Sequence, residues 1–363
     1  MSSKRVWLLC SNRWNSAITE YALRSAQALQ RAGWSSFYSP LAKSPGAQRA
    51  RAMGLDGPEF ADFGPGSWPM FIRELRRIQP DALLLFGGPE TFLSRGAASS
   101  IPKLRFRGQD NDVAQDLPTW RTRFGLSHCA GVITPGALLQ DRFAGVLDGK
   151  PVWNIPLGLE ASQFQFQSGA LAEVARPTLR LVGRLDPIKG HKAFFQLYAS
   201  MLALWAPELP HPFLEVIGQA ANLSAETLRA YASTAGLIEG EHWTLCAERL
   251  TDLPQRMRAT HLGVIPSLGS EVICRVAEEF LLAGCPLFVS GVGTLGECLF
   301  SDMAGVNYAG LSEKEAAERL RTILEQAFRE SDRERFLRSE EATRRFSLER
   351  MGAELVKALE AVL

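Results

Sequence analysis

The chain has 363 residues, of which 46% are hydrophobic and 22% charged, a composition typical of a globular protein long enough for two domains. Its 40 lysine and arginine residues nearly balance 39 acidic residues, so no overall positive field indicates nucleic acid as a partner. The six cysteines form no C-x-x-C pair, which favours reduced thiols in a cytosolic protein. No apolar run reaches the ~18 residues of a membrane span, and the run Val6 to Cys10 is too short for a signal peptide. We therefore expect a cytoplasmic protein, peripheral at most on the cytoplasmic membrane face.

Strands and helices alternate along the first half of the sequence. Arg5 to Cys10 predicts a buried strand, Ala17 to Arg31 repeats apolar residues at helical spacing, and Trp34 to Tyr38 predicts a second strand. This β-α-β opening predicts a parallel sheet with helices on both faces. Residues 43–66, rich in glycine, proline and alanine, are predicted to be irregular. The rest of this half predicts helices at 67–79 and 136–144 and strands at 81–86, 102–107, 130–134 and 152–155.

The pattern restarts after a stretch without periodicity, which predicts an interdomain linker at 161–177. The elements predicted beyond it are strands at 178–182, 213–217, 243–246 and 262–265, helices at 191–205, 225–235 and 253–259, a strand at 306–309 and helices at 312–329 and 332–363. The predicted fold class is α/β, with two doubly wound Rossmann-like domains at 1–160 and 178–340. We expect the carboxyl ends of both sheets to face a cleft, and a last helix at 341–363 to pack back on the first domain.

The stretch Pro266 to Glu297 carries the most chemistry. It predicts a loop that contains Glu271, a helix that contains Glu279, a short strand and a glycine-rich turn, with a helix start signal at Ser270 and Glu271. A helix N-terminus favours phosphate as a ligand. An ionised carboxylate can only accept hydrogen bonds, and sugar hydroxyls can donate them. Glu271 and Glu279, eight positions apart, therefore indicate a nucleotide-sugar site. The structural alternatives are a helix cap for Glu271 and an exposed helix position for Glu279.

Two cations follow the strand predicted at 178–182. Arg184 and Lys189 bracket Asp186 and Pro187 and precede a helix, which is where α/β proteins bind ligands. Arginine offers a forked donor and lysine a point charge, so together they can neutralise a diphosphate. The structural alternative is a solvated turn in which Arg184 pairs with Asp186.

Three ordered motifs together resemble the retaining glycosyltransferases of family 4, which have the GT-B fold of two Rossmann-like domains facing each other across a cleft. They are the E-x7-E spacing with the following Ala283 to Pro286 and Gly293 to Glu297, the segment Val182 to Gly190, and the segment Ile155 to Glu160, where Leu157 stands in place of the usual Asn. The resemblance implies metal-independent transfer of a sugar from a nucleoside diphosphate donor, with the donor held mainly by the second half.

The resemblance also implies a role for each matching residue. Arg184 and Lys189 would stabilise charge on the departing diphosphate, and Glu271 would contact the donor sugar or the reacting centre. The implied donor-binding positions are Glu279, Gly183, Cys274, Arg275 and Ser16. Glu279 would accept hydrogen bonds from ribose hydroxyls, whereas its neighbour Glu278 cannot share the same helix face. For Arg275, a phosphate contact and a pair with a nearby acid remain open.

One departure concerns backbone geometry. The family often has Gly-Phe-Gly after the first motif glutamate, where Val272, Ile273 and Cys274 stand here. A cysteine takes a positive φ only at a cost, so the geometry of this loop is open.

Two further motifs match known ligand-binding patterns, but their positions in the sequence argue against both. The triplet Asp110 to Asp112 matches the metal-binding D-x-D of another glycosyltransferase fold. It lies in the wrong half for the donor diphosphate, so we expect no metal and no cofactor besides the donor. The run Gly291 to Gly296 fits G-x-G-x-x-G, but the next strand ends without an acid to hold a ribose, which argues against nicotinamide.

The acceptor is expected on the first half. Asp110 and Arg107 are the candidate acceptor-side residues, with an Asx-capped turn as the alternative for Asp110. Other basic residues of this half are Arg105, Arg121 and Arg123, and Trp68, Phe71, Arg73, Arg76 and Arg77 share one amphipathic segment. They suggest that the protein binds an anionic acceptor or a membrane surface. The structural alternative is an ordinary helix that covers the sheet and has a charged outer face.

These observations predict a glycosyltransferase that moves a sugar to a glycan or glycolipid acceptor of the cell-envelope polysaccharide or lipopolysaccharide type. One alternative is a nucleotide-sugar-binding protein of the same fold that has lost turnover, since the family's glycines and its His-Asp are replaced. A sugar-nucleotide epimerase of the same architecture is the other.

Overall fold

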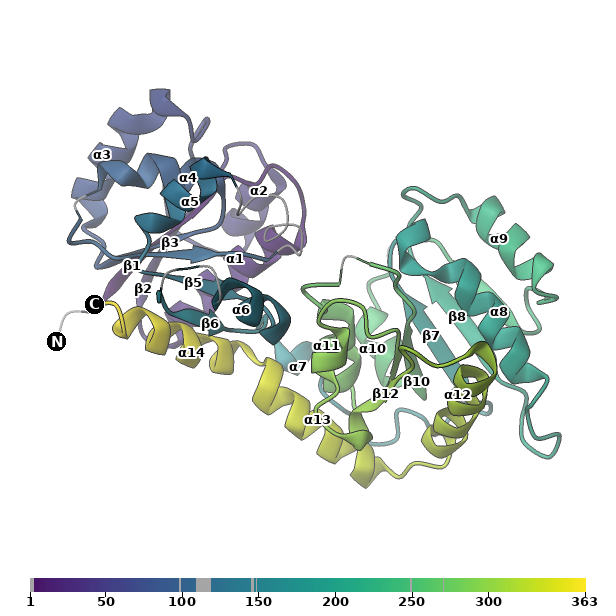
Figure 1. The fold of residues 1–363 in the computed structure, drawn as a ribbon. Coiled ribbons are helices and arrows are strands. Elements are labelled where there is room, and N and C mark those ends of the chain that lie inside the picture. The colour runs from purple at the N-terminus through teal and green to yellow at the C-terminus, as the bar shows by residue number, and fades with distance from the viewer. Residues whose placement is uncertain are drawn as a thin grey trace. The chain divides into compact units, whose positions relative to one another are not determined.

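The protein is described by a computed structural model that covers residues 3–97, 99–108, 119–144, 147, 149–248, 250–269 and 271–363. The chain forms two compact units (Figure 1). The first comprises residues up to Leu159 together with Phe346–Leu363, and the second comprises Glu160–Arg345. Each unit is described by itself.

The first unit is built on a six-stranded parallel sheet with the order β2-β1-β3-β4-β5-β6. Its strands are β1 (Arg5–Cys10), β2 (Ser35–Pro40), β3 (Ala82–Leu85), β4 (Lys103–Phe106), β5 (Gly131–Thr134) and β6 (Val152–Asn154). Its helices are α1 (Ala17–Arg31), α2 (Pro45–Ala52), α3 (Trp68–Ile78), α4 (Gly88–Leu93), α5 (Trp120–Ser127), α6 (Ala137–Ala144) and α14 (Leu348–Glu360), with 3-10 turns at Pro65–Ser67 and Ser94–Gly96.

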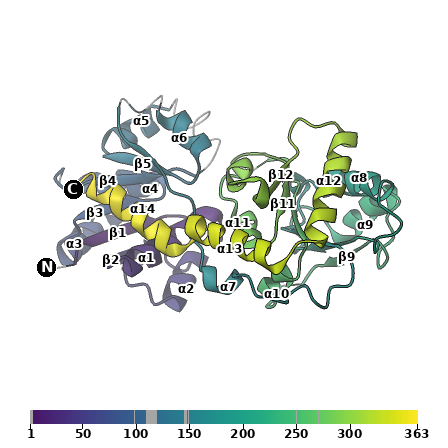
Figure 2. The same cartoon turned by 90° about the horizontal axis from the view of Figure 1, so that it is seen from below.

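Helices cover both faces of this sheet because the strand side chains alternate between two apolar layers. On one face Trp7 stacks on Phe71 of α3, with 5.1 Å between ring centroids. On the other face Phe106 stacks on Tyr21 of α1 at 4.0 Å. The last helix, α14, packs along α1 (Figure 2), where Arg31 pairs with Glu349 at 2.7 Å.

Helix α3 is a sheet-covering helix rather than a free amphipathic surface. Phe71 is fully buried in the core of the first unit. On the same helix, Glu74 accepts hydrogen bonds from Arg73 at 3.0 Å and Arg77 at 2.5 Å. The basic face that suggested a membrane contact is therefore partly neutralised by its own helix. In the part of the chain described, no helix is long and apolar enough to cross a membrane.

The prediction that residues 43–66 are irregular is wrong for α2. Ser44 caps this helix by accepting the Ala47 N–H at 3.1 Å, and Pro45 occupies its first turn. A capping serine followed by proline is a helix start signal, and the glycine-rich composition obscured it. The short helices α4 and α5 were also not predicted.

The second unit repeats the architecture, with a parallel sheet of order β12-β11-β10-β7-β8-β9. Its strands are β7 (Thr178–Val182), β8 (Phe213–Ile217), β9 (Trp243–Cys246), β10 (Leu262–Ile265), β11 (Leu287–Val289) and β12 (Gly305–Asn307). Its helices are α7 (Ala161–Phe164), α8 (His191–Leu202), α9 (Ala225–Thr234), α10 (Leu253–Arg258), α11 (Arg275–Leu282), α12 (Glu313–Phe328) and α13 (Asp332–Phe346), with 3-10 turns at Pro187–Lys189, Leu295–Cys298 and Asp302–Ala304. Helix α7 lies inside the stretch predicted as linker.

The core of the second unit also has two layers. Helices α8 and α12 pack together over one face (Figure 2). Phe195 of α8 and Leu320 of α12 are buried in the core cluster there. Helix α11 packs on the other face, where Phe280 lies directly against Gly263 of β10. The charged helix α13 is anchored by buried arginines, since Arg338 donates to the Gly284 carbonyl at 2.6 Å, beyond the end of α11. Both doubly wound Rossmann-like units predicted from the sequence are therefore present.

Candidate active site

The candidate site lies at the carboxyl edge of the second sheet. Strands β7 and β10 are neighbours, and the strand order runs outward from them in opposite directions. Such a reversal leaves a crevice at the carboxyl ends of the two strands, where open α/β sheets bind ligands. The segment Arg184–Gly190 follows β7 and the loop Pro266–Cys274 follows β10, so the two predicted motifs meet at this point.

The two segments are tied together by their backbones. Leu268 N–H donates to the Ile188 carbonyl at 2.7 Å. Gly190 has φ +75°, and a Cβ there would lie well within 3.0 Å of the Pro266 carbonyl oxygen. Glycine is required at residue 190 both for its left-handed conformation and for this close approach.

The side chains of the two motifs form an ion pair. Lys189 Nζ contacts Glu271 Oε1, and the Ser267 hydroxyl donates to the same oxygen at 2.5 Å. Glu271 is only 6% exposed, and a buried carboxylate requires such partners. The structure thus brings together Lys189 and Glu271, two of the three residues predicted to be catalytic.

Arg184, the third, does not form the pair with Asp186 that the structural alternative required. Among the described residues no carboxylate lies within ion-pair distance of Arg184, whose side chain is exposed. Asp186 accepts the Ile188 N–H at 3.1 Å and the Asn222 amide at 2.8 Å. These bonds, with the charges of Arg184 and Lys189 nearby, lower the pKa of Asp186. Arg184 therefore stands at the edge of the site with its guanidinium available to a ligand.

Gly183 lies at the end of β7, where a second close approach occurs. Its N–H donates to the Ile217 carbonyl at 2.9 Å. A Cβ on Gly218 would fall inside contact distance of the Gly183 carbonyl oxygen. Gly218 lets the turns after β7 and β8 touch, which holds the Arg184 turn in place.

The glycine-rich turn after β11 folds over the Glu271 loop. Gly293 has φ +63°, and a Cβ there would meet the Glu271 carbonyl oxygen. Thr294, which the sequence did not single out, donates its N–H to that same carbonyl at 2.8 Å. Its hydroxyl also lies 3.2 Å from Cys274 Sγ. This turn thus fixes the backbone of Glu271, while Ser267 and Lys189 fix its carboxylate.

Glu271 lies in the loop as predicted, but the helix start expected at Ser270 and Glu271 is wrong. Helix α11 begins at Arg275, and Ser270 lies outside the described residues. Glu271 is drawn into tertiary contacts instead, so the helix starts four residues later. Cys274, its N-cap, has φ −91° and gives no side-chain cap, so the loop does not need the positive φ that a glycine would supply.

Glu279 and Arg275 lie on α11 behind this loop. Glu279 is 6% exposed and pairs with Arg275 at 3.2 Å, one helical turn away. The exposed position considered for Glu279 is therefore wrong, and of the two alternatives for Arg275 the acidic partner is present. Glu278 is also buried, which the sequence did not indicate.

The other predicted positions belong to the first unit. Ser16 is the N-cap of α1, where its hydroxyl accepts the Thr19 N–H at 3.4 Å. Arg107, at the end of β4, is buried with its guanidinium 5.9 Å from the Phe143 ring centroid. Asp110, with the rest of its D-x-D triplet, lies outside the described residues. Within the described ranges, no group of three or more His, Cys, Asp or Glu residues could hold a metal ion.

The first sheet has its own buried carboxyl group at the corresponding point of its strand order. Glu90, on α4 after β3, accepts the Ser11 N–H at 3.1 Å from the loop after β1. Gly87 leaves the space that the carboxyl group fills. Complete burial raises the pKa of Glu90, and the charge of Arg105 opposes the shift. A glutamate after Gly-Gly-Pro at a strand end was the signal that the sequence offered.

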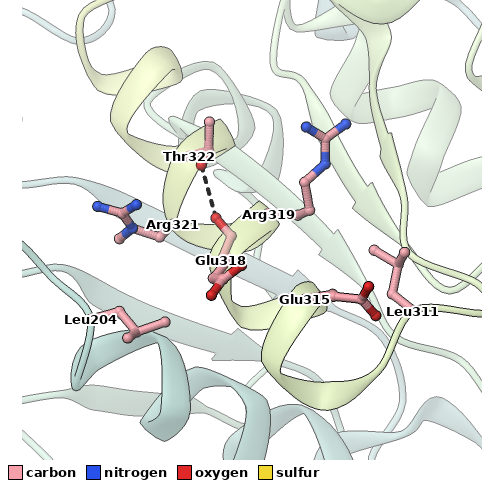
Figure 3. Close-up of a pocket in the computed structure, with 7 residues that line it drawn as sticks. All are labelled: Leu204, Leu311, Glu315, Glu318, Arg319, Arg321 and Thr322. Carbon is pink, nitrogen blue, oxygen red and sulfur yellow. Dashed lines mark hydrogen bonds between the residues drawn. The ribbon is translucent and has the colours of Figure 1, made fainter.

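A separate hollow of about 610 Å³ lies beside α12, near the end of α8 (Figure 3). It is lined by Leu204, Leu311, Glu315, Glu318, Arg319, Arg321 and Thr322. The Thr322 hydroxyl bonds the carbonyl of Glu318 in its own helix at 2.9 Å (Figure 3). The hollow shares no residue with the loops after β7 and β10, so it is not part of the candidate active site.

The protein has two doubly wound parallel sheets, and the Lys189–Glu271 ion pair lies at the strand reversal of the second one. This architecture is that of a GT-B protein. Residues 165–342 match the family model of the glycosyl transferases of group 1. This match, together with the fold, identifies the protein as a glycosyltransferase. A search of curated proteins finds no matching sequence.

Several solved structures share the fold over nearly the whole length of the chain. Alr3699/HepE of Anabaena in complex with UDP has a TM-score of 0.76 at 15% identity, covering 98% of this chain and 100% of that one. A glycosyltransferase from Rickettsia africae ESF-5 has a TM-score of 0.76 at 10% identity, covering 100% and 99%. The apo form of the lipopolysaccharide outer core galactosyltransferase WaaB has a TM-score of 0.72 at 11% identity, covering 99% and 100%. At these identities the likeness concerns the fold alone.

Proposed function

We propose that the protein transfers a sugar from a nucleoside diphosphate sugar to a glycan or glycolipid acceptor, without a metal ion and with retention of the anomeric configuration. The observation that carries the proposal is the meeting of Lys189 and Glu271 at the strand reversal of the second sheet. One residue matches a diphosphate in charge and the other matches sugar hydroxyls in hydrogen bonding.

The donor is placed with its diphosphate against Arg184 and Lys189. The N-terminus of α11 follows the Glu271 loop, and a helix N-terminus favours an anion such as phosphate. The HepE structures contain UDP and UDP-glucose, which supports a uridine diphosphate sugar as the first donor to test. Glu279 would accept hydrogen bonds from the ribose.

In the proposed reaction the bond between the sugar's anomeric carbon and the phosphate oxygen breaks. An acceptor hydroxyl forms its new bond to that carbon on the same face, and its proton passes to the departing phosphate oxygen. Arg184 and Lys189 stabilise the charge that develops on the diphosphate, the term that usually dominates such catalysis. Before this, Lys189 must exchange part of its contact with Glu271 for phosphate.

We place the acceptor on the first unit and the protein in the cytoplasm, peripheral on the membrane face where its acceptor is a glycolipid. The fold likeness to a lipopolysaccharide galactosyltransferase supports a cell-envelope acceptor. Arg107 and Asp110 remain the proposed acceptor-side positions, and Ser16 remains a proposed donor contact.

Arg184→Ala is the variant that tests the proposal. Because Arg184 is exposed and has no ion-pair partner among the described residues, the variant should fold as the wild type does. We expect turnover of a uridine diphosphate sugar to fall by about 100-fold or more. Lys189→Ala should lose at least as much. The matched control is Arg229→Ala, which removes an exposed arginine of α9 paired with Glu239 at 2.8 Å and should leave turnover unchanged.

A thermal-shift screen with uridine, guanosine and adenosine diphosphates identifies the base, because only a bound nucleotide raises the midpoint. Unchanged transfer in both the Arg184 and Lys189 variants would refute the assignment of these residues. Nucleotide-sugar binding without hydrolysis or transfer to any acceptor would instead favour a binding protein that has lost turnover.

A further inference from the structure

We propose that Ser267 is a positioning residue, which holds one carboxylate oxygen of Glu271 so that the other is presented to a hydroxyl of the donor sugar. This inference rests on the proposed function and assigns a role to a residue outside the predicted motif positions. Ser267 is 1% exposed and would not touch the donor itself.

The contacts of the Glu271 carboxylate are unequal. Lys189 Nζ and the Ser267 hydroxyl both contact Oε1, the latter at 2.5 Å. No described residue donates a hydrogen bond to Oε2. An ionised carboxylate only accepts hydrogen bonds, so Oε2 retains capacity for a ligand's O–H. The protein uses one oxygen for orientation and leaves the other for binding.

Ser267 can act as a fixed reference because its own backbone is held from two sides. Its carbonyl accepts the Ser290 hydroxyl at 2.6 Å, from the end of β11. The next residue, Leu268, is bonded to Ile188 of the turn after β7 at 2.7 Å. A serine fixed in this way removes rotational freedom from the Glu271 carboxylate before the donor arrives, which is how preorganised groups lower a barrier.

Lys189 alone does not provide this orientation. Its ammonium is a compact point charge on a flexible stem, so without the Ser267 hydroxyl the carboxylate can turn to meet it with either oxygen. Sugar alignment would then suffer, whereas a nucleoside diphosphate without a sugar has no hydroxyl placed for Glu271 and should bind as before. A loss of turnover without a loss of diphosphate affinity is therefore the specific signature.

The experiment compares Ser267→Ala with Ser267→Thr, which keeps the hydroxyl. We expect kcat for Ser267→Ala to fall about 10- to 100-fold, the range for losing a hydrogen bond to a charged group. The dissociation constant for uridine diphosphate should stay within about twofold, and Ser267→Thr should recover most of kcat. The matched control is Ser339→Ala, which removes a buried hydroxyl bonded to the Leu282 carbonyl and the Phe166 N–H and should leave kcat unchanged.

A double-mutant cycle with Glu271→Ala tests the route of the effect. If Ser267 acts through Glu271, adding Ser267→Ala to that background should change the residual turnover by less than about twofold. A full effect in that background, a kcat of Ser267→Ala close to wild type, or an equal loss of diphosphate affinity would each overturn the inference. Absence of any transfer by the wild type would count against the proposed function instead, so the two failures are distinguishable.

Discussion

Replacing Gly190 by alanine tests whether the backbone contact between the two site segments holds the site together. Gly190 has φ +75°, and a Cβ there would lie well within 3.0 Å of the Pro266 carbonyl oxygen. Gly236, in the turn after α9, has φ +76° but nothing within 4 Å of the same position. Gly236→Ala therefore carries the same backbone cost without the collision, which makes it a matched control.

The expected losses in free energy of unfolding follow from the left-handed backbone conformation and from the collision with Pro266. A left-handed conformation costs a non-glycine residue about 1–2 kcal/mol, offset by about 0.4–1 kcal/mol from the lower entropy of the unfolded chain. Gly236→Ala should thus lower the free energy of unfolding by about 1 kcal/mol. The collision at residue 190 adds about 1–3 kcal/mol, giving about 2–4 kcal/mol for Gly190→Ala. For a unit of this size that is a fall in thermal midpoint of roughly 5–15 °C, against roughly 2–4 °C for the control.

The assay is thermal unfolding followed by circular dichroism, with sugar transfer measured well below both midpoints. Relief of the collision moves the turn after β7, and with it Lys189, away from Glu271. We therefore expect kcat to fall about tenfold or more in Gly190→Ala and to stay near the wild-type value in Gly236→Ala. Equal loss of stability in the two variants would refute the reasoning, because the contact with Pro266 would then contribute nothing.

Two predictions concern pH. Burial lowers the pKa of His191 from 6.5 to about 4. As pH falls, the imidazole is therefore protonated in the unfolded chain before it is protonated in the folded protein. About 3 kcal/mol of the free energy of unfolding should be lost as pH falls from 6.5 to 4. Urea titrations should show a smaller acid loss in His191→Leu, and an unchanged loss would contradict the assignment. Burial instead raises the pKa of Glu90 above 4.5, so its contribution to stability declines as pH rises from 4.5 through the folded value. Glu90→Gln keeps an acceptor for Ser11 and should remove that decline; a Gln variant with the wild-type slope would show that another group titrates.

Much of the fold can be predicted from local sequence patterns. The strand predicted at 178–182 and the helix predicted at 17–31 coincide with β7 and α1, because buried parallel strands appear as short apolar runs and surface helices as a regular stripe. The predicted boundaries of helices and strands are less reliable where residues that favour a loop lie next to residues that start a helix. Helix α2 was missed since Gly, Pro and Ala around it suggested a loop, although Ser44 and Pro45 marked its start.

The sequence predicted individual residues of the candidate site but not the contacts between them. Resemblance to a family singled out Lys189 and Glu271, yet the helix expected at Glu271 begins at Arg275. A start signal is a local property, whereas Glu271 is engaged by a lysine 82 residues away. The roles of Ser267 and Thr294 were not predicted, although Thr294 lies within the glycine-rich motif, because nothing near them in the sequence shows which carboxylate or carbonyl they contact.

The amino-acid sequence by itself determined the alternation of strands and helices, the two-domain α/β class and the residue types at each strand end. The tertiary structure decided that β7 lies beside β10, although β8 and β9 come between them in the chain. That neighbour relation places Lys189 against Glu271 and Gly190 against Pro266. Strand order depends on how all the helices and strands of a unit bury their apolar faces together, so the site exists only once that packing is complete.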